Sequence, residues 1–229
     1  MRCLACNDPS TRLVLDLGRQ PLANHLLETP DAPFGTYPLG LECCPACGHG
    51  QLSHFASPEE LFRHYLYASG TSGSLGRYFD WFARAFAPGS DILEIACNDG
   101  SLLARFKPHG FKLLGVDPAS NLAQQSRAKG LEVIDEFWPC PQATGGRKFD
   151  LIVGMNVAAH TPDPFGFMVG VADALKDDGL CVIQTSQARM LINGEFDTIY
   201  HEHYSFYTPR SMATLAARAG LELRAVSMV

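Results

Sequence analysis

The regular alternation of apolar runs with helical patterns from Asp91 onward constrains the fold of this chain more than any other feature. Runs such as DILEIA and FDLIVGM have the length and the branched side chains of buried strands, and the segments between such runs have helical spacing. Strands that alternate with helices predict an α/β fold with a doubly wound parallel sheet. The predicted elements are the strands DILEIA, KLLGVD, LEVI, FDLIVGM and LCVIQTS, and the helices SLLARF, SNLAQQSRAKG and FMVGVADALKDDG.

The last part of the chain predicts one more helix and one more strand. Thr208 is a good N-cap, Pro209 suits the first helical position, and Gly220 suits the position after a helix that ends at Ala219. The apolar alternation in LELRAVSMV then predicts a closing strand. We therefore assign residues 91–229 to the α/β domain.

Two CxxC pairs near the amino terminus predict a metal site. Cys3 and Cys6 form the first pair and Cys44 and Cys47 the second, so four thiolates can surround one tetrahedral zinc ion. Cys43 could replace Cys44 at CxxxC spacing. The alternatives are two disulfides or a redox CxxC, but a redox motif normally opens a helix of a thioredoxin-like unit, and neither pair lies in such a pattern.

The stretch between the two pairs predicts that the zinc is structural. It is rich in proline and glycine and would have difficulty building a core alone, so metal binding would stabilise a small domain over residues 1–56. With four cysteine ligands the ion has no open position for catalysis. We expect His25, His49 and His54 to be surface or packing histidines rather than ligands.

Residues 57–90 predict a helical junction. Ser57 as N-cap, Pro58 at the first helical position and Glu60 in a capping box begin a helix that runs into ASGTSGSLG, where the glycines should end it. Helical spacing resumes in RYFDWFARAFA. The glycine-rich strip is either a linker or a lid over a ligand, with Tyr65 and Tyr67 at its edge.

The loop after the first predicted strand indicates a nucleoside-type cofactor. Ala96, Asn98 and Gly100 in EIACNDG allow close approach of the backbone to a ligand, and Asp117 ends the next strand, where a carboxylate can accept both ribose hydroxyls. The loop lacks the GxGxxG pattern of a pyrophosphate cradle. A cofactor with a ribose but no phosphate, S-adenosylmethionine (SAM), fits this loop better than a nicotinamide dinucleotide.

Charge and hydropathy disfavour two classes of partner. The formal net charge is -6 and the pI is about 5.7, and residues 1–54 contain three arginines, no lysine and five acidic residues, so we expect no nucleic-acid partner. No run of eighteen apolar residues and no signal-peptide core occurs, so we expect no membrane partner and a cytoplasmic location. The sequence does not indicate the oligomeric state.

Several segments together resemble a known family over nearly the whole chain. RCLAC, LGRQPLANHLL, YPLGLECCPACGHGQL, LEIACNDGSLLARF, GVDPASNLA and FDTIYHEHYSFYT resemble the sugar C-methyltransferases, which methylate C3 of nucleotide-linked 4-keto deoxysugars. The resemblance implies an enzyme with a Rossmann-like class I SAM methyltransferase sheet, a zinc-bound amino-terminal domain and a nucleotide sugar as its small-molecule substrate. It also implies cofactor contacts from Ala96, Asn98, Gly100, Asp117, Pro118, Glu136, Phe137 and Asn156.

The chain departs from the family at three places. Relatives continue for well over a hundred residues into a carboxy-terminal domain, whereas this chain ends at Val229, so we expect either a truncated piece or a different way of holding the substrate. Gln184 occupies a position where relatives tend to have a glutamate that contacts the ligand. Cys97 occurs where serine or glycine is common, and we expect it only to line the pocket.

The segment IYHEHYSFYTP carries the predicted catalytic residues. By resemblance these are Tyr200, Glu202 and His203, and we expect irregular backbone, because Tyr200 and His203 meet only if the chain turns. Our hypothesis is that His203 removes the C3 proton, Glu202 orients or charges the imidazole, and Tyr200 hydrogen-bonds the sugar or its developing oxyanion. His160 is a second polar contact or the base itself. We expect His201 to face solvent.

Two other functions remain open from the sequence. One is a zinc-knuckle RNA methyltransferase, which the few basic residues near the cysteines disfavour. The other is a cofactor-binding fragment without independent activity.

Overall fold

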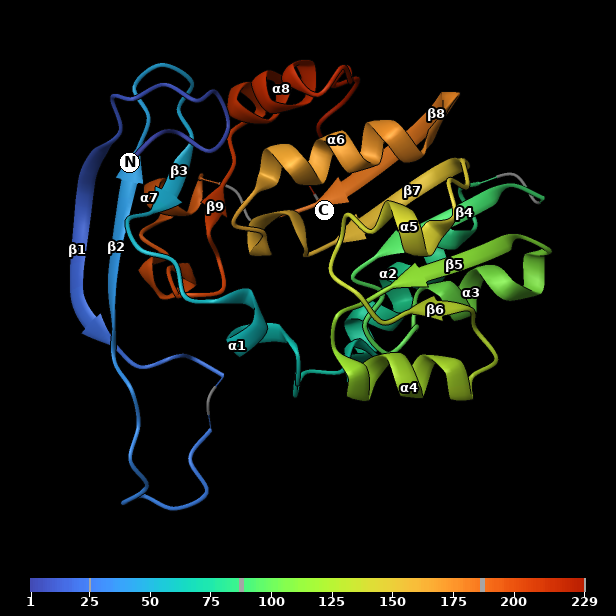
Figure 1. Ribbon diagram of the computed structural model, residues 1–229, viewed down its shortest axis with the longest axis horizontal. Helices are drawn as coiled ribbons and strands as arrows, with labels where there is room; N and C mark the ends of the chain where they lie inside the picture. Colours follow the sequence, from blue (N-terminus) through green and yellow to red (C-terminus); the bar gives the residue numbers. More distant parts are fainter. Residues whose placement is uncertain (25, 87–88, 186–187, 229) are drawn as a thin grey trace. The chain divides into compact units, whose positions relative to one another are not determined.

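The computed structural model describes residues 1–24, 26–86, 89–185 and 188–228, which form two compact units (Figure 1). The first unit contains Met1–Pro58, Ala158–Met168 and Thr185–Val229, and the second contains Glu59–Val157 and Val169–Gln184. The end of the chain, which the sequence alone assigns to the α/β domain, therefore packs with the zinc-binding segment. No helix in the described ranges is long and apolar enough to cross a membrane.

The first unit is built on a four-stranded antiparallel sheet in the order β1-β2-β3-β9. The strands are β1 (Arg12–Gln20), β2 (Tyr37–Cys43), β3 (Gly50–Leu52) and β9 (Ser205–Phe206). Pairing of Gly50 with Phe206 joins the amino-terminal segment to the IYHEHYSFYTP segment. Leu41, Leu52, Ile199 and Phe206 form the apolar core beneath this sheet, so the predicted catalytic segment is part of the first unit's core.

Short helices complete the first unit. They are the 3-10 turns η3 (Ala158–His160) and η4 (Phe196–Thr198) and the α-helices α7 (Met190–Asn193) and α8 (Pro209–Arg218). The helix predicted after Thr208 is confirmed, since the Thr208 side chain accepts a hydrogen bond from the Ser211 N–H and the Ser211 side chain caps in return. Helix α6 (Pro164–Ala174) contains residues of both units.

The second unit contains a five-stranded parallel sheet in the order β6-β5-β4-β7-β8, as the alternation of strands and helices predicts. The strands are β4 (Asp91–Ile95), β5 (Lys112–Val116), β6 (Val133–Ile134), β7 (Phe149–Met155) and β8 (Leu175–Gln184). Phenylalanines of α2 and α3 pack against β4 and β7 in the main core. The helices are α1 (Pro58–Phe62), η1 (Ser69–Thr71), α2 (Gly73–Ala83), α3 (Leu103–Phe106), η2 (Lys107–His109), α4 (Ser120–Ala128) and α5 (Pro141–Thr144).

Four sequence-based predictions of secondary structure are wrong in part. The helix predicted over FMVGVADALKDDG ends at Ala174, and its last five residues begin β8 at Leu175. Helix α1 begins at Pro58 as predicted but ends at Phe62, and α2 begins inside the glycine-rich strip, because Ser72 caps it by accepting from the Leu75 N–H. Residues 221–228 form no strand and are mostly exposed. No described strand pairs with this tail, and apolar alternation without a neighbouring strand leaves the backbone groups to water.

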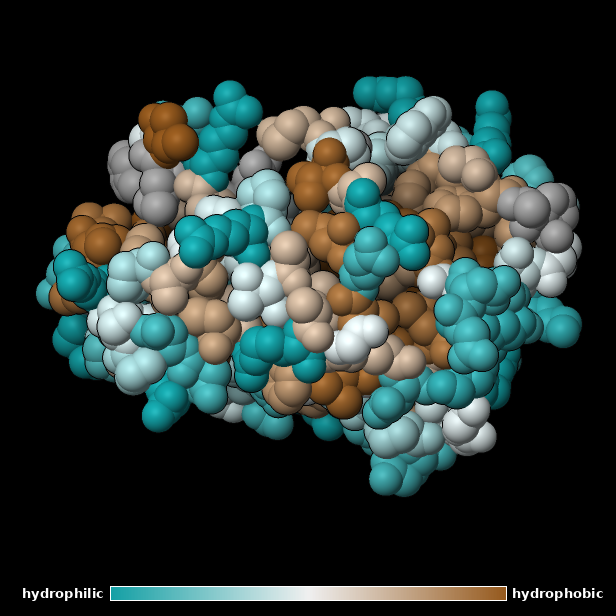
Figure 2. Space-filling model, turned by 90° about the horizontal axis from the view of Figure 1, so that it is seen from above, coloured by the Kyte–Doolittle hydropathy of each residue, from teal (hydrophilic) through white to brown (hydrophobic). Residues whose placement is uncertain are grey.

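The surface keeps some apolar residues exposed. On the face shown in Figure 2, brown apolar patches lie among teal polar side chains. Trp81 on α2 and Leu180 on β8 are two of the large exposed apolar residues in the second unit. Scattered apolar exposure of this kind is normal for soluble domains and by itself indicates no partner.

Candidate active site and metal centre

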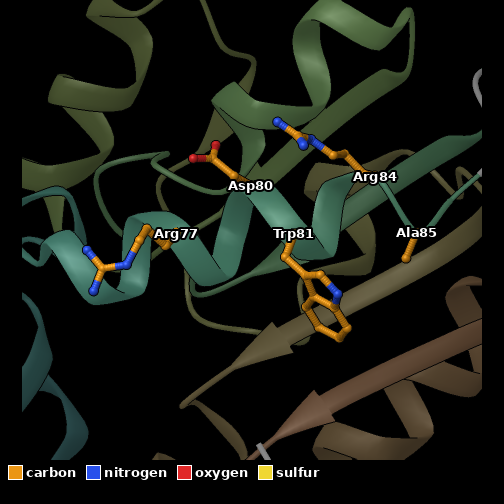
Figure 3. A pocket seen from close by; sticks show the side chains of 5 residues that line it. All are labelled: Arg77, Asp80, Trp81, Arg84 and Ala85. Atoms are coloured by element: carbon orange, nitrogen blue, oxygen red, sulfur yellow. The ribbon is translucent and has the colours of Figure 1, made fainter.

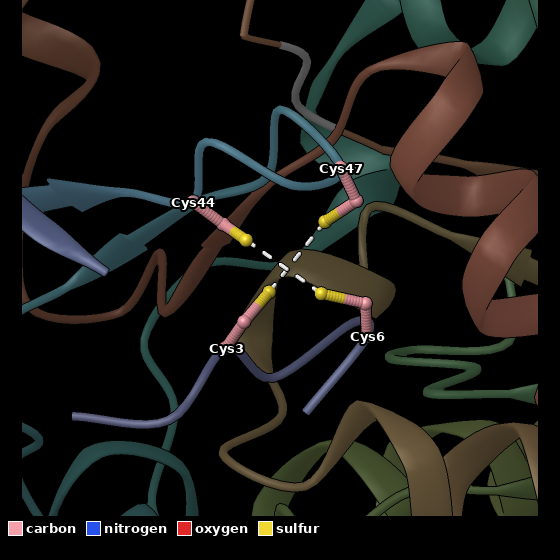
Figure 4. Close-up of side chains that lie close together, drawn as sticks. All are labelled: Cys3, Cys6, Cys44 and Cys47. Atoms are coloured by element: carbon pink, nitrogen blue, oxygen red, sulfur yellow. Dashed lines mark hydrogen bonds between the residues drawn. The ribbon is translucent and has the colours of Figure 1, made fainter. Parts of the chain in front are cut away.

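The four cysteines of the two CxxC pairs converge as the sequence predicts. The Sγ atoms of Cys3, Cys6, Cys44 and Cys47 lie within 4.8 Å of one another and point at a common centre (Figure 4). The Cys3–Cys47 and Cys6–Cys44 sulfur pairs are 3.6 Å apart. Thiolates at about 2.3 Å from a tetrahedral zinc ion are about 3.8 Å from one another. The residues therefore fit zinc, and two disulfides are excluded because all of these cysteines are free.

Each cysteine pair is a tight turn that ends in a left-handed residue. Asn7 and Gly48 follow the second cysteine of their pairs and have φ of 65° and 74°. The Asn7 N–H donates to the Cys3 carbonyl and the Gly48 N–H to the Cys44 carbonyl. Cys43 lies in β2, outside the cluster. The structure thus selects Cys44 as the ligand that the spacing left open.

The other amino-terminal histidines are not ligands of this cluster. His49 is fully buried against the Tyr207 ring, at 5.1 Å between ring centroids, and burial lowers its pKa to about 4. His54 is exposed and contacts the Ser53 hydroxyl. These two are packing and surface histidines as predicted, and His25 lies outside the described residues.

The predicted cofactor loops of the second unit contain unusual backbone. Ala96, Asn98 and Asn156 have φ of 56°, 53° and 53°, and Gly100 has φ of 73°. Ala96, Asn98 and Gly100 follow β4 and Asn156 follows β7, at the carboxyl ends of neighbouring strands. Non-glycine residues in the left-handed region are costly and cluster at ligand sites. This concentration of strain at one sheet edge supports a ligand site there.

Two buried carboxyl groups at that edge can accept hydrogen bonds from the hydroxyl and ammonium groups of SAM. Asp117 follows β5, accepts from the Asn98 and Ala119 N–H groups, and has its pKa raised to about 6 by burial. Glu94, inside β4, has a buried Oε2 with no hydrogen-bond partner among the described residues, and burial raises its pKa. Each carboxyl can accept further bonds, which ribose hydroxyls or an ammonium group can donate. Glu94 was not predicted as a cofactor residue, although a carboxylate within an apolar strand is a visible signal in the sequence.

Several predicted cofactor residues have other neighbours in the structure. The Asn98 side chain bonds the backbone of Tyr67 and Ser69, and its own backbone N–H and carbonyl bond Asp117 and Ser126, so Asn98 shapes the loop through these contacts. Glu136 and Phe137 follow β6 beside the Arg63 guanidinium. Pro118 is half-buried after Asp117.

Cys97 and Gln184, the two positions that depart from the family, have partners within the second unit. Cys97 was expected to line the pocket, and this is wrong, because it is buried with Leu103 and Ala123 in an apolar cluster. Its thiol lies where Gly115 leaves room for it. Gln184 ends β8, and its carbonyl accepts from the Asn156 N–H.

The Tyr200–His203 segment turns as predicted and forms a hydrogen-bonded dyad. The His203 N–H donates to the Tyr200 carbonyl at 3.0 Å, and the Tyr200 hydroxyl lies 3.1 Å from His203 Nε2. His203 Nδ1 lies 3.0 Å from the Thr198 carbonyl, which can only accept. Nδ1 therefore carries the proton, and the Nε2 lone pair accepts from the Tyr200 hydroxyl. Thr198 could not be recognised from the sequence, because it contributes a backbone carbonyl.

Burial sets the protonation of this dyad. Burial lowers the pKa of His203, although the Thr198 carbonyl opposes the effect. Burial, followed by the charge of Glu202, raises the pKa of Tyr200 to about 12. At neutral pH the pair is a neutral imidazole and a protonated phenol, which are a base and a hydrogen-bond donor.

His160 joins the dyad within the first unit. Its ring centroid lies 4.8 Å from that of His203, edge to face. Burial, and secondarily the His203 imidazole, lower its pKa to about 3, so two neutral imidazoles lie in contact. The structure therefore brings together Tyr200, His203 and His160.

Glu202 and His201 have partners that the sequence did not reveal. Glu202 is buried and accepts a hydrogen bond from Asn24 at 2.5 Å, whereas the Thr198 carbonyl is what orients the His203 ring. His201 was expected to face solvent, and this is wrong. It is 1% exposed, packs against Tyr37 and lies 3.4 Å from the Tyr37 carbonyl. The turn places His201 against Tyr37, the first residue of β2.

Two hollows lie on the described surface near residues of interest. A cavity of about 600 Å³ in the first unit includes Thr198 in its wall, which otherwise consists of Thr185, Arg189, Met190, Asn193, Glu195 and Met228. A shallower one of about 380 Å³ lies on α2, where Arg77, Asp80, Trp81 and Arg84 point in different directions (Figure 3). Only the first hollow adjoins a residue that contacts the predicted base.

Residues 62–226 match a protein family described as "Methyltransferase domain", and residues 3–62 match one described as "Putative zinc binding domain". The chain belongs to this methyltransferase family. Its cofactors are SAM and zinc, as the sequence predicts, and membership of this family agrees with the predicted enzyme class, a SAM-dependent methyltransferase.

Comparisons with individual proteins agree with this family. The methyltransferase is 31% identical to the C-methyltransferase NovU of Streptomyces niveus, over 96% of this chain and 56% of that protein. It is 28% identical to a ubiquinone biosynthesis O-methyltransferase of Dinoroseobacter shibae, over 58% of this chain and 60% of that protein. The chain thus spans little more than half the length of these relatives.

A solved structure supports the predicted fold class. The crystal structure of a SAM-dependent methyltransferase from Thermotoga maritima superposes with a TM-score of 0.51 at 17% identity, over 63% of this chain and 70% of that chain. At this identity the likeness concerns the fold alone. It agrees with the parallel sheet of the second unit.

Proposed function

We propose that this methyltransferase methylates a carbon atom, C3 of a nucleotide-linked 4-keto deoxysugar. The observation that carries the proposal is the state of His203, whose Nδ1 proton is held by the Thr198 carbonyl while Nε2 keeps its lone pair next to the Tyr200 hydroxyl. A neutral buried imidazole is a base suited to proton removal near neutral pH. Transfer to a carbon needs such a base, because the carbon must lose a proton.

The proposed reaction assigns a task to each group of the cluster. His203 Nε2 takes the proton from C3, which the neighbouring ketone acidifies, and the electron pair moves toward the ketone oxygen. The Tyr200 phenol, still protonated at its raised pKa, turns from Nε2 to donate a hydrogen bond to that oxygen. His160 is neutral because its pKa is lowered, so its ring contact places no second positive charge beside His203. Bound SAM would supply the electrophilic methyl group for C3, with S-adenosylhomocysteine as the leaving group.

Two further observations support a small-molecule substrate of this kind. The cavity of about 600 Å³ has the size of a ligand pocket, and its wall mixes an arginine, a carboxylate, an amide and hydroxyls with two methionines, which suits a hydroxylated ring. The similarity to a protein named as a C-methyltransferase favours carbon as the acceptor. We therefore propose that Glu202, fixed by Asn24, sets the local charge beside Tyr200.

The direct test is methyl transfer to a panel of nucleotide-linked 4-keto deoxysugars, followed by mass spectrometry of the product. We expect the wild type to add one methyl group at carbon and His203→Gln to lose this activity while it still binds SAM. His54→Gln, at an exposed histidine, is the matched control and should keep full activity. Methylation of oxygen in place of carbon, or full activity of His203→Gln, would contradict the proposal.

A further inference from the structure

Residues 63–71, which we call the strap, touch the loops after three neighbouring strands of the second unit. At one end, the Gly70 N–H donates to Asp99 at 3.2 Å, and Asn98 exchanges hydrogen bonds with Ser69 and Tyr67 at 2.8 and 2.9 Å. These contacts lie on the loop after β4. They engage both the oxygen and the nitrogen of the Asn98 amide, so the strap is fixed to a residue of the cofactor loop.

The middle and the other end of the strap meet the next two strands in order. Tyr65 and Asn121, which lies at the start of α4 after β5, exchange backbone-to-amide bonds at 3.3 and 2.8 Å. Arg63 lies 3.9 Å from Asp135 and 4.0 Å from Glu136, after β6, and its guanidinium is 4.8 Å from the centroid of the Phe137 ring. The strap thus follows the carboxyl ends of β4, β5 and β6, where ligands of doubly wound sheets bind.

We propose that the strap is the outer wall of the SAM site, with Arg63 stacked on the adenine and Gly70 closing the end that holds the amino-acid moiety. This inference rests on the cofactor site assigned above. Asp117 after β5 marks the ribose, so the base lies toward β6 and the amino-acid moiety toward the loop after β4. A planar guanidinium held by two carboxylates beside a phenylalanine ring is a suitable stacking surface for a purine.

The strap lies so close to the loop after β4 that residue 70 has no room for a side chain. A Cβ atom at Gly70 would lie 2.5 Å from Asp99 Oδ2 and 2.8 Å from Ser101 Oγ, both of buried side chains, so any larger residue must lift the strap from the loop. Gly73, three residues later, offers a matched control, since its Cβ would meet only the end of the Arg77 side chain at 3.9 Å.

The experiment compares two probes that differ by the amino-acid moiety, S-adenosylhomocysteine and 5′-methylthioadenosine, by calorimetry on the full chain. Gly70→Ala should weaken S-adenosylhomocysteine about tenfold and methylthioadenosine much less, because only the first probe reaches the β4 loop. Arg63→Ala should weaken both about five- to tenfold, because both carry adenine. Gly73→Ala and Arg77→Ala should bind both probes as the wild type does.

The outcomes separate this inference from the cofactor assignment. If the wild type binds neither probe, the assigned cofactor site is wrong. If the wild type binds and Arg63→Ala and Gly70→Ala bind both probes equally well, the strap is not a wall of the site. Arg63 is on the surface, so its substitution should not unfold the unit, and hydrogen exchange of residues 63–71 should slow when S-adenosylhomocysteine is added.

Discussion

Replacing His160 by phenylalanine should make the protein more resistant to acid. His160 is largely buried against His203, and burial lowers its pKa from 6.5 to about 3 in the folded state. In the unfolded chain the imidazole takes up a proton below pH 6.5, whereas in the folded protein it stays neutral. Each pH unit below 6.5 therefore favours the unfolded state, until the pH approaches the folded pKa.

The magnitude follows from the size of this shift. At pH 5.0 the unfolded imidazole is about 1.5 units below its pKa, which corresponds to about 2 kcal/mol of lost stability. His160→Phe removes that loss. The difference in unfolding free energy between variant and wild type should thus move by about 2 kcal/mol in favour of the variant from pH 7.5 to pH 5.0, whatever its value at pH 7.5.

Urea unfolding followed by circular dichroism at four pH values between 7.5 and 5.0 measures this difference. His54→Phe is the control, because His54 is exposed and its substitution should leave the pH dependence unchanged. Effects of acid on the zinc thiolates occur in all three proteins and cancel in the comparison. Parallel stability curves for His160→Phe and the wild type would refute the burial of a neutral imidazole at this position.

Three other predictions concern the metal, a helix cap and the phenol. Cys44→Ser should lose bound zinc and the folding transition of the first unit, whereas Cys43→Ser should keep both. Metal analysis and circular dichroism measure the two effects. Equal zinc content in the two variants would contradict the ligand assignment. Thr208→Ala should lower the unfolding free energy by about 1 kcal/mol in urea titrations, because it removes the capping box of α8, and an unchanged midpoint would argue against that cap. Tyr200→Phe should lower kcat by about a hundredfold or more with SAM affinity unchanged, and an equal loss in binding would show that the phenol holds the cofactor instead.

The sequence predicts most of the second unit because its signals are local. Buried parallel strands are continuous apolar runs, so β4, β5, β7 and the second half of β8 could be recognised without knowledge of their neighbours. The left-handed backbone at Asn98 also follows from a local preference of asparagine. The CxxC spacing similarly fixes the metal ligands apart from the choice between Cys43 and Cys44.

The sequence could not predict features that depend on tertiary neighbours. His201 is buried because β2 lies against the turn, and Glu202 is bonded by Asn24 from a segment far away along the chain. The closing strand expected after Gly220 is absent among the described residues because strand formation needs a partner as well as an apolar pattern. The carbonyl that orients His203 belongs to Thr198, and a backbone group leaves no mark in composition or spacing.

The resemblance carried information that physical patterns alone did not. It singled out Tyr200 and His203 before any geometry was known, and the structure places their side chains in hydrogen-bond contact. It also included the segment with Asn24, whose amide bonds Glu202.

The central claim is that the imidazole of His203 removes a proton from the carbon that is to be methylated. Deuterium uptake at C3 of a nucleotide-linked 4-keto deoxysugar, followed by NMR in deuterated water with S-adenosylhomocysteine in place of SAM, isolates this step. We predict exchange with the wild type and none above the uncatalysed rate with His203→Gln. Exchange at the wild-type rate in His203→Gln would contradict the claim.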